Sequence, residues 1–178
     1  PDTVYKFMVN NVALGVREKS VSKKAKEGET QGALLWDKGT LELQLDVYPV
    51  DETDNPAEAA PKQRLFVPLP VPNPAVEGHT RPDVKNCWTY TNILHAAFPD
   101  KFPETPRWNG DSYVSATGEL MDADEARQMR VTALTRMADY AIDLVGSPAS
   151  WVGLTFFGKT KASVSGDKTY INIDPVSE

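Results

Sequence analysis

The sequence predicts a β-rich α+β fold built as a strongly bent antiparallel sheet or small barrel with a helical insertion. Three observations predict it: apolar residues alternate near both ends of the chain, two helical patterns lie between them, and a proline-rich stretch separates the first strands from the helices. The 178 residues suffice for one well-packed domain, which we expect to span residues 1–178.

The first 40 residues are expected to form strands followed by a basic connection. Apolar residues alternate over 5–9 and over 12–16, and Asn10-Asn11 between them predicts a turn. Residues 17–26, here called the basic arm, hold five bases and one acid. Two interpretations stay open for the basic arm: it is a solvated linker, or it contacts phosphates through three lysines, Lys23, Lys24 and Lys26.

Residues 41–48 give the clearest strand pattern, with aliphatic side chains on one face and polar ones on the other. The following stretch, 49–82, contains eight of the 14 prolines, so most of it is expected to be loop or polyproline-like extension. Residues 64–67 remain as a short strand that pairs with 41–48. The acidic run 51–58 then forms the tip of a long hairpin.

The segment 83–146 is predicted to be a helical insertion. Its first helix, 83–98, begins at the capping residue Asp83 and stops before Pro99. The second, 122–145, begins with Asp122 in a capping-box pattern and ends at Gly146. A stripe of small residues and methionines on the second helix is interpreted as core packing rather than as an adaptable groove.

The last segment, 151–174, is predicted to be a hairpin that turns at Gly166-Asp167. We expect Gly158 at a bend where one strand serves both halves of the sheet. The side chains expected to point inward are Val152, Leu154, Phe156, Ile171 and Ile173, and those expected to point outward include Thr155, Phe157, Lys159, Lys161, Tyr170 and Asn172.

Several classes of site are not supported by the sequence. Residues 153–160 match the phosphate-loop pattern G-x-x-x-x-G-K-[ST], but strand-type residues fill the loop and a hairpin follows it in place of a helix. The single cysteine, Cys87, and the two histidines, His79 and His95, belong to no recognisable catalytic or metal-binding pattern. We expect no enzyme activity, no cofactor and no metal. No leader or membrane-spanning stretch is apparent, so the expected compartment is the cytoplasm.

The outward face of the C-terminal hairpin combines aromatic and basic residues. This composition is typical of surfaces that bind single-stranded nucleic acid, because rings stack on bases of any identity and cations meet phosphates. The sequence therefore predicts sequence-tolerant binding of single-stranded DNA without catalysis. An alternative is that Phe157 packs under the helical insertion and the lysines keep an exposed edge soluble. The predicted stacking residues are Phe66, Phe157 and Tyr170, and the predicted phosphate contacts are Arg64, Lys159, Lys161 and Lys168.

These strands resemble the OB-fold single-stranded-DNA-binding proteins of tailed bacteriophages. The residues that carry the resemblance are 151–161 with Gly158, 168–173 and 41–48. The resemblance implies an OB-like barrel and a role in DNA replication or recombination in the host cytoplasm. Proteins of this kind often end in a longer acidic tail than residues 174–178 provide, so the acidic run 51–58 is the expected contact for replication proteins.

A second class of function stays open, that of a phage virion structural or assembly protein that uses the β-domain for protein contacts. The acidic net charge of −6 and the long segments 1–40 and 49–82 favour it, since both segments suit contacts with a neighbour, including another copy of the chain. Three aromatic residues in expected loops, Trp36, Trp108 and Tyr113, are candidate interface anchors.

Overall fold

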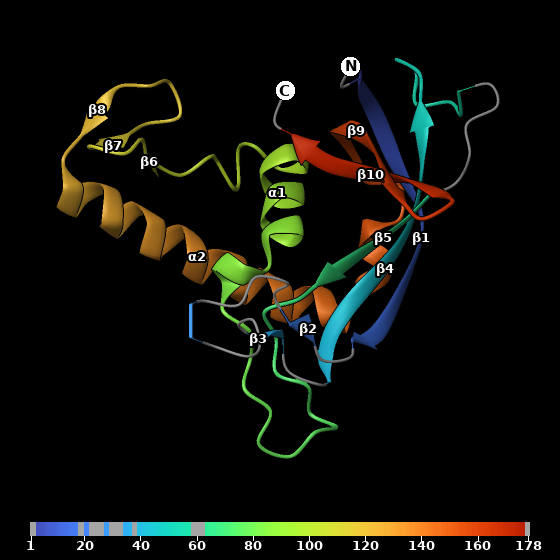
Figure 1. Ribbon diagram of the computed structural model, residues 1–178, viewed down its shortest axis with the longest axis horizontal. Helices are drawn as coiled ribbons and strands as arrows, with labels where there is room; N and C mark the ends of the chain where they lie inside the picture. Colours follow the sequence, from blue (N-terminus) through green and yellow to red (C-terminus); the bar gives the residue numbers. More distant parts are fainter. Residues whose placement is uncertain are drawn as a thin grey trace.

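The computed structural model describes residues 3–17, 20–21, 27–28, 34–36, 39–57 and 63–176, and it has the expected α+β architecture (Figure 1). Five long strands form one antiparallel sheet: β1 (Thr3–Arg17), β4 (Thr40–Val50), β5 (Gln63–Pro68), β9 (Thr155–Ser165) and β10 (Lys168–Val176). The helices are α1 (Trp88–Ala97) and α2 (Ala123–Gly146), with the 3₁₀ turns η1 (Val84–Asn86) and η2 (Pro148–Trp151). Short strands make two further pairings, β2 (Ser20–Val21) with β3 (Leu34–Trp36), and β6 (Arg107–Trp108) with β7 (Tyr113–Val114) and β8 (Leu120–Met121).

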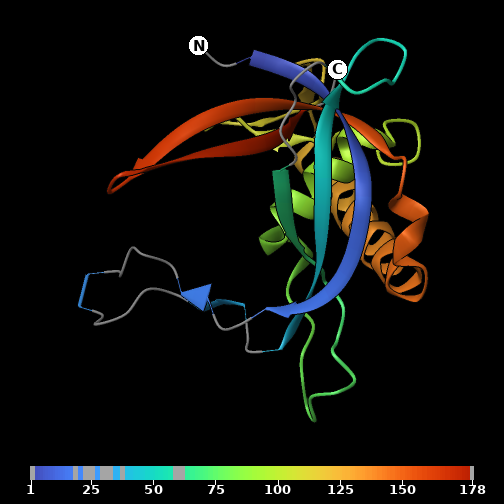
Figure 2. The ribbon, with the colours of Figure 1, turned by 90° about the vertical axis from the view of Figure 1, so that its right-hand side faces the viewer.

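The main sheet is curled into a half-barrel with the strand order β10-β9-β1-β4-β5 (Figure 2). The chain runs through β1, β4 and β5 as neighbours, crosses through the helices, and returns as the β9–β10 hairpin on the other side of β1. This is the connectivity of an OB-like barrel with a helical insertion after its third strand. The strands β5 and β10 are the two edges of the sheet.

Strand β1 corrects the prediction of a turn at Asn10-Asn11. The strand is continuous, and its register against β4 shifts between Val9 and Asn11 as in a β-bulge. At the bulge, the Val9 N–H donates to the Leu154 carbonyl (2.9 Å) and the Val9 carbonyl accepts from the Gly153 N–H (2.8 Å). The chain does not reverse at Asn10-Asn11, because the N–H and carbonyl groups of the preceding residue, Val9, are hydrogen-bonded to the segment that leads into β9. The two asparagines therefore lie at a bulge within one strand.

The β4–β5 hairpin is present as predicted, with Arg64–Val67 paired to β4. At its tip the Asp51 carboxylate accepts hydrogen bonds from the N–H groups of Thr53 and Asn55, at 2.8 and 3.0 Å, and Asp54 forms an ion pair with Lys6. These two acids of the run 51–58 therefore shape the hairpin tip. Beyond β5 the proline-rich chain still contributes Leu69 and Val71 to the core.

Of the two helices, α2 begins at the predicted residue, whereas the predicted start of the first helix is wrong: Asp83 caps the 3₁₀ turn η1, and α1 begins later, at Trp88. Asp83 Oδ1 accepts from the Lys85 N–H before η1, and Asp122 Oδ1 accepts from the N–H groups of Asp124 and Glu125 before α2. The predicted buried stripe of α2 is wrong at Met129, which is 47% exposed, although Ala126 in the same half of the helix is fully buried. Only the second half of α2 packs on the sheet, while the first half extends away from it toward β6–β8 (Figure 1).

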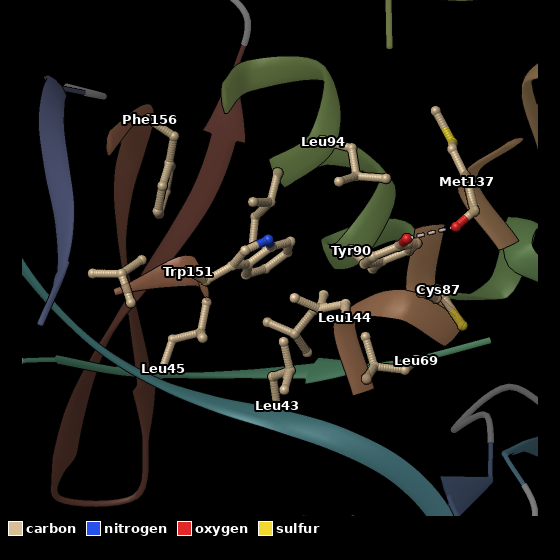
Figure 3. Packing of buried hydrophobic residues seen from close by; sticks show 14 of the residues in the cluster. Leu43, Leu45, Leu69, Cys87, Tyr90, Leu94, Met137, Leu144, Trp151 and Phe156 are labelled. Atoms are coloured by element: carbon tan, nitrogen blue, oxygen red, sulfur yellow. Dashed lines mark hydrogen bonds between the residues drawn. The ribbon is translucent and has the colours of Figure 1, made fainter. Parts of the chain in front are cut away.

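The core lies between the sheet and the helices (Figure 3). Tyr90 of α1 stacks on Trp151 of η2 with ring centroids 6.4 Å apart, and the Tyr90 hydroxyl donates to the Met137 carbonyl of α2 at 2.6 Å. Leu43 and Leu45 of β4 are fully buried below these rings. Through these contacts α1, α2 and η2 pack together on one face of the sheet.

The C-terminal hairpin turns at Gly166 and Asp167 as predicted, and Phe156 and Ile173 point into the core. Val152 and Ile171 do not, since each is about half exposed (51%). Val152 precedes β9. Ile171 of β10 pairs with Ala162 of β9, which comes after Thr160, the last β9 residue that pairs with β1. The outer part of the hairpin thus extends past the body of the sheet (Figure 2).

Gly158 lies where β9 is flanked by both β1 and β10, opposite Tyr5 and Pro175. The predicted position is therefore confirmed, but the reason for glycine is space rather than backbone conformation. A Cβ atom at residue 158 would lie 2.8 Å from the Ile173 side chain and 3.2 Å from the Phe7 ring.

Candidate nucleic-acid interface

A groove of about 460 Å³ lies between the two edges of the half-barrel. The strand β5 forms one wall, β10 with Lys161 of β9 forms the other, and residues 86–89 at the start of α1 close one end. Because β5 and β10 do not pair with each other, the curl of the sheet leaves this space between them.

Two aromatic side chains border the groove. On β5, Phe66 lies opposite Gln44 and Arg64 lies opposite Asp46, so both point to the polar face of the sheet, while Val67 points into the core. Phe66 is 44% exposed and Trp88, the first residue of α1, is 55% exposed. Large exposed rings next to a groove are suited to stacking on planar ligands.

Cationic side chains lie beside these rings. The guanidinium carbon of Arg17 is 5.9 Å from the centroid of the Phe66 ring. Arg64 and Lys161 line the same groove, and Asp174 is the one carboxylate among the groove residues that the structure describes. The groove therefore combines three cations with two rings.

Two carboxylates of β4 fix the directions of the arginines. Glu42 is nearly buried and lies 2.8 Å from Arg17 Nε, and Asp46 accepts a hydrogen bond from Arg64 Nε at 3.0 Å. The hydrogen bond to Asp46, together with the negative charge of Asp46, raises the pKa of Arg64 above its ordinary value. In both ion pairs the arginine Nε faces the carboxylate, which holds the guanidinium group beside the groove. The two carboxylates also weaken the positive electrostatic potential of the groove.

The structure brings together three of the residues predicted from the sequence: Arg64, Phe66 and Lys161. Two more, Phe157 and Lys159, share the face of β9 with Lys161 by strand alternation, but neither lines the groove. Lys168 is exposed beside the hairpin turn. The side chain of Tyr170 and the residues Lys23, Lys24 and Lys26 lie outside the described part of the structure.

Sequence reasoning missed Trp88 and did not assign Arg17 to the groove. Trp88 lies in a predicted helix whose buried stripe runs through Cys87, Tyr90 and Leu94. Trp88 does not belong to that buried stripe, so its position in the sequence could have indicated a tryptophan ring exposed on the helix surface. The charge pattern places Arg17 in the basic arm, whereas the structure shows that it ends β1 beside β4.

The histidines and the cysteine considered for catalysis make contacts within the fold. His95 Nδ1 lies 2.8 Å from the Phe102 carbonyl, and His79 Nδ1 accepts the Asn73 N–H at 3.1 Å. Burial, with a smaller contribution from the charge of Asp83, raises the pKa of the Cys87 thiol to about 12. The phosphate-loop pattern runs into β9, and its lysine, Lys159, lies within a strand instead of at the start of a helix.

Within the described ranges, no helix is both long enough and apolar enough to cross a membrane. Comparisons of the chain with protein-family models, curated proteins and solved structures found no match.

Proposed function

We propose that this protein binds single-stranded DNA without strong sequence preference and without catalysis, in DNA replication or recombination. The observation that carries the proposal is the groove between β5 and β10, where Phe66 and Trp88 stand beside Arg17, Arg64 and Lys161. Exposed rings and cations in one groove are the combination that a flexible, unpaired strand uses, because each unpaired base offers a face for stacking.

The place of the groove in the fold supports the same function. OB-folds bind oligonucleotides on the face of their second and third strands, between the loops that join strands one to two and four to five. Here β4 and β5 are the second and third long strands, and Phe66 and Arg64 stand on their polar face. The β9–β10 hairpin takes the place of the fourth and fifth strands and extends past the sheet (Figure 2).

Stacking on each ring is expected to contribute about 1–3 kcal/mol. Replacing Trp88 by alanine should then weaken binding about 5- to 150-fold. Trp108 provides a matched control, because it is also 55% exposed but lies on β6, away from the groove. Affinity is measured by fluorescence anisotropy of fluorescein-labelled oligo-dT at low salt.

The proposal requires that Trp88→Ala and Phe66→Ala weaken binding while Trp108→Ala binds like the parent. Equal losses in Trp88→Ala and Trp108→Ala would show that the groove is not the binding site. Far-ultraviolet circular dichroism of each variant checks that its fold is retained.

A second candidate function, that of a structural or assembly protein, is favoured by one observation. The short strands β6–β8 lie at the far end of α2 and expose Trp108 and Leu120, the latter by 77% (Figure 1). Exposed aromatic and aliphatic side chains on a projecting element are typical interface anchors. Size-exclusion chromatography with light scattering tests this candidate, since a large assembly that forms without DNA would favour it.

A further inference from the structure

Strand β10 forms one edge of the main sheet, so within the described residues its backbone has a neighbouring strand on one side only. In an antiparallel pair, hydrogen-bonded and non-hydrogen-bonded positions alternate along each strand. Lys168 follows a two-residue turn and pairs with Ser165, so Lys168 and every second residue after it bond to β9. The backbone N–H and carbonyl groups of Thr169, Ile171 and Ile173 therefore point away from the sheet.

Pro175 agrees with this alternation and ends the usable part of the edge. It pairs with Gly158 at a position whose N–H would point outward, where a proline removes no hydrogen bond of the sheet. A strand added to the edge can therefore bond to residues 169–173. The hairpin that carries this edge extends past the body of the sheet (Figure 2), Ile171 is 51% exposed, and the groove of about 460 Å³ leaves space beside residues 171–174.

Two opposite charges flank the centre of this edge symmetrically. Lys168 lies three positions before Ile171 and Asp174 lies three positions after it, and both share the strand face opposite to that of buried Ile173. Within the described residues neither of them forms an ion pair. The other charged side chains near the edge are Asp167 in the turn, Lys159 and Lys161 on β9, and Arg17 and Arg64 across the groove.

From this symmetry we infer that a second copy of the chain pairs its own β10 with this edge, antiparallel and about a two-fold axis at Ile171. In this register Ile171 lies opposite Ile171 of the second copy, and Thr169 lies opposite Ile173. All the outward-facing backbone groups of residues 169–173 are then paired. Each Lys168 lies directly opposite Asp174 in a non-hydrogen-bonded pair, the arrangement in which opposed side chains are closest.

The charges and the proline select this register over its neighbours. Shifting the second copy by two residues in either direction places Lys168 opposite Asn172 or Val176, which carry no charge. Either shift also brings a turn residue or the proline, which has no N–H, opposite an outward-facing residue, so fewer backbone groups are paired. In the centred register the acidic turn residue lies opposite the proline, and Asp174 lies between two lysines, Lys159 of its own chain and Lys168 of the second copy.

The pairing covers one wall of the nucleic-acid groove, because residues 171–174 line it. The second copy and a bound DNA strand therefore compete for this wall, and the dimer is the form without DNA. This competition rests on the proposed function, whereas the pairing of the two copies does not.

Sedimentation equilibrium of the DNA-free protein over a range of concentrations tests the pairing, and we expect a reversible dimer. Lys168→Asp places two carboxylates opposite each other at both ends of the interface, and Asp174→Lys does the same with two amines, so each should weaken the dimer about tenfold. The double variant reverses both charges and should dimerise like the parent. Lys101→Asp, an exposed position between α1 and β6, makes the same change of net charge away from the edge and is the control.

A second variant tests the backbone pairing itself. Ile171→Pro removes an N–H that points outward, so the hairpin should keep its hydrogen bonds to β9 while the dimer is lost. Far-ultraviolet circular dichroism of each variant checks that its fold is retained.

The inference is overturned by a protein that stays monomeric at every concentration, by single charge reversals that dimerise like the parent, or by a folded double variant that does not recover. An assembly larger than a dimer also contradicts it, because the pairing uses up the edge. Oligo-dT should convert the dimer to monomers, and a dimer that persists with DNA bound would place the interface elsewhere. Absence of oligo-dT binding refutes the proposed function alone, since the dimer is measured without DNA.

Discussion

Replacing Gly158 by alanine tests how tightly β9 packs between β1 and β10. The new Cβ atom would lie 2.8 Å from Ile173 Cγ2 and 3.2 Å from two carbons of the Phe7 ring, all of them in the core. Contacts below 3.0 Å force a side chain or a strand to move, and overpacking of this kind costs about 1–3 kcal/mol. For a domain of this size the expected fall in Tm is about 3–10 °C.

The assay is urea unfolding followed by tryptophan fluorescence, to which buried Trp151 contributes. In an Ile173→Ala background the closest contact is absent, so Gly158→Ala should cost at least about 1 kcal/mol less than it does in the parent. Gly146→Ala is the matched control, because a Cβ atom at residue 146 would have no atom within 4 Å and the backbone there is helical. A Gly158→Ala variant as stable as the parent, or equal costs in both backgrounds, would refute the packing argument.

Three further predictions concern the core and the basic arm. Tyr90→Phe removes the 2.6 Å hydrogen bond to the Met137 carbonyl and should lower the free energy of unfolding by about 1–2 kcal/mol, measured by urea unfolding. The control Tyr48→Phe loses only a contact between its hydroxyl and the sulfur of Met8, so its free energy of unfolding should fall by less. Because burial raises the pKa of Cys87 to about 12, the thiol should resist thiol reagents at pH 8 until urea unfolds the chain, and rapid labelling of the native protein would contradict this. The contribution of the buried, protonated thiol to the free energy of unfolding should be lost as the pH rises from about 8.5, the pKa of an exposed thiol, toward about 12. Replacing Lys23, Lys24 and Lys26 of the basic arm by alanine should weaken DNA binding and make its salt dependence shallower, because these side chains would no longer release counterions from phosphates. Phe66→Ala should instead weaken binding with the salt slope unchanged. Parent-like binding of the triple lysine variant at every salt concentration would identify the arm as a linker.

Strand β4 and the start of α2 were predictable from the sequence because local chemistry determines them. Alternation indicated β4, and the carboxylate of Asp122 occupies the capping position that its spacing indicated, whereas Asp83 caps the 3₁₀ turn that precedes α1. Asn10 misled the prediction because the residues that bond to Val9 lie more than 140 positions later in the chain. A turn signal cannot report whether a distant segment will supply those hydrogen bonds.

The candidate groove was only partly predictable for the same physical reason. Arg64 and Phe66 could be placed on one face of a strand by alternation, but the approach of β5 to β10 depends on the curl of the whole sheet. Trp88 reaches the groove because α1 begins beside β5, and strand or helix periodicity carries no information about that contact. Likewise, the methionine stripe of α2 predicted burial, yet the first half of the helix extends past the sheet (Figure 1), so Met129 stays exposed.

The most direct test of the proposed function is the affinity of the parent protein for fluorescein-labelled oligo-dT across a series of salt concentrations. If Arg17, Arg64 and Lys161 each meet one phosphate, the slope of log K against log salt should be about −2, and steeper if the basic arm takes part. We expect tight binding at low salt with that dependence, and weaker binding of duplex DNA, whose bases are not free to stack. Absence of binding to oligo-dT at low salt would contradict it.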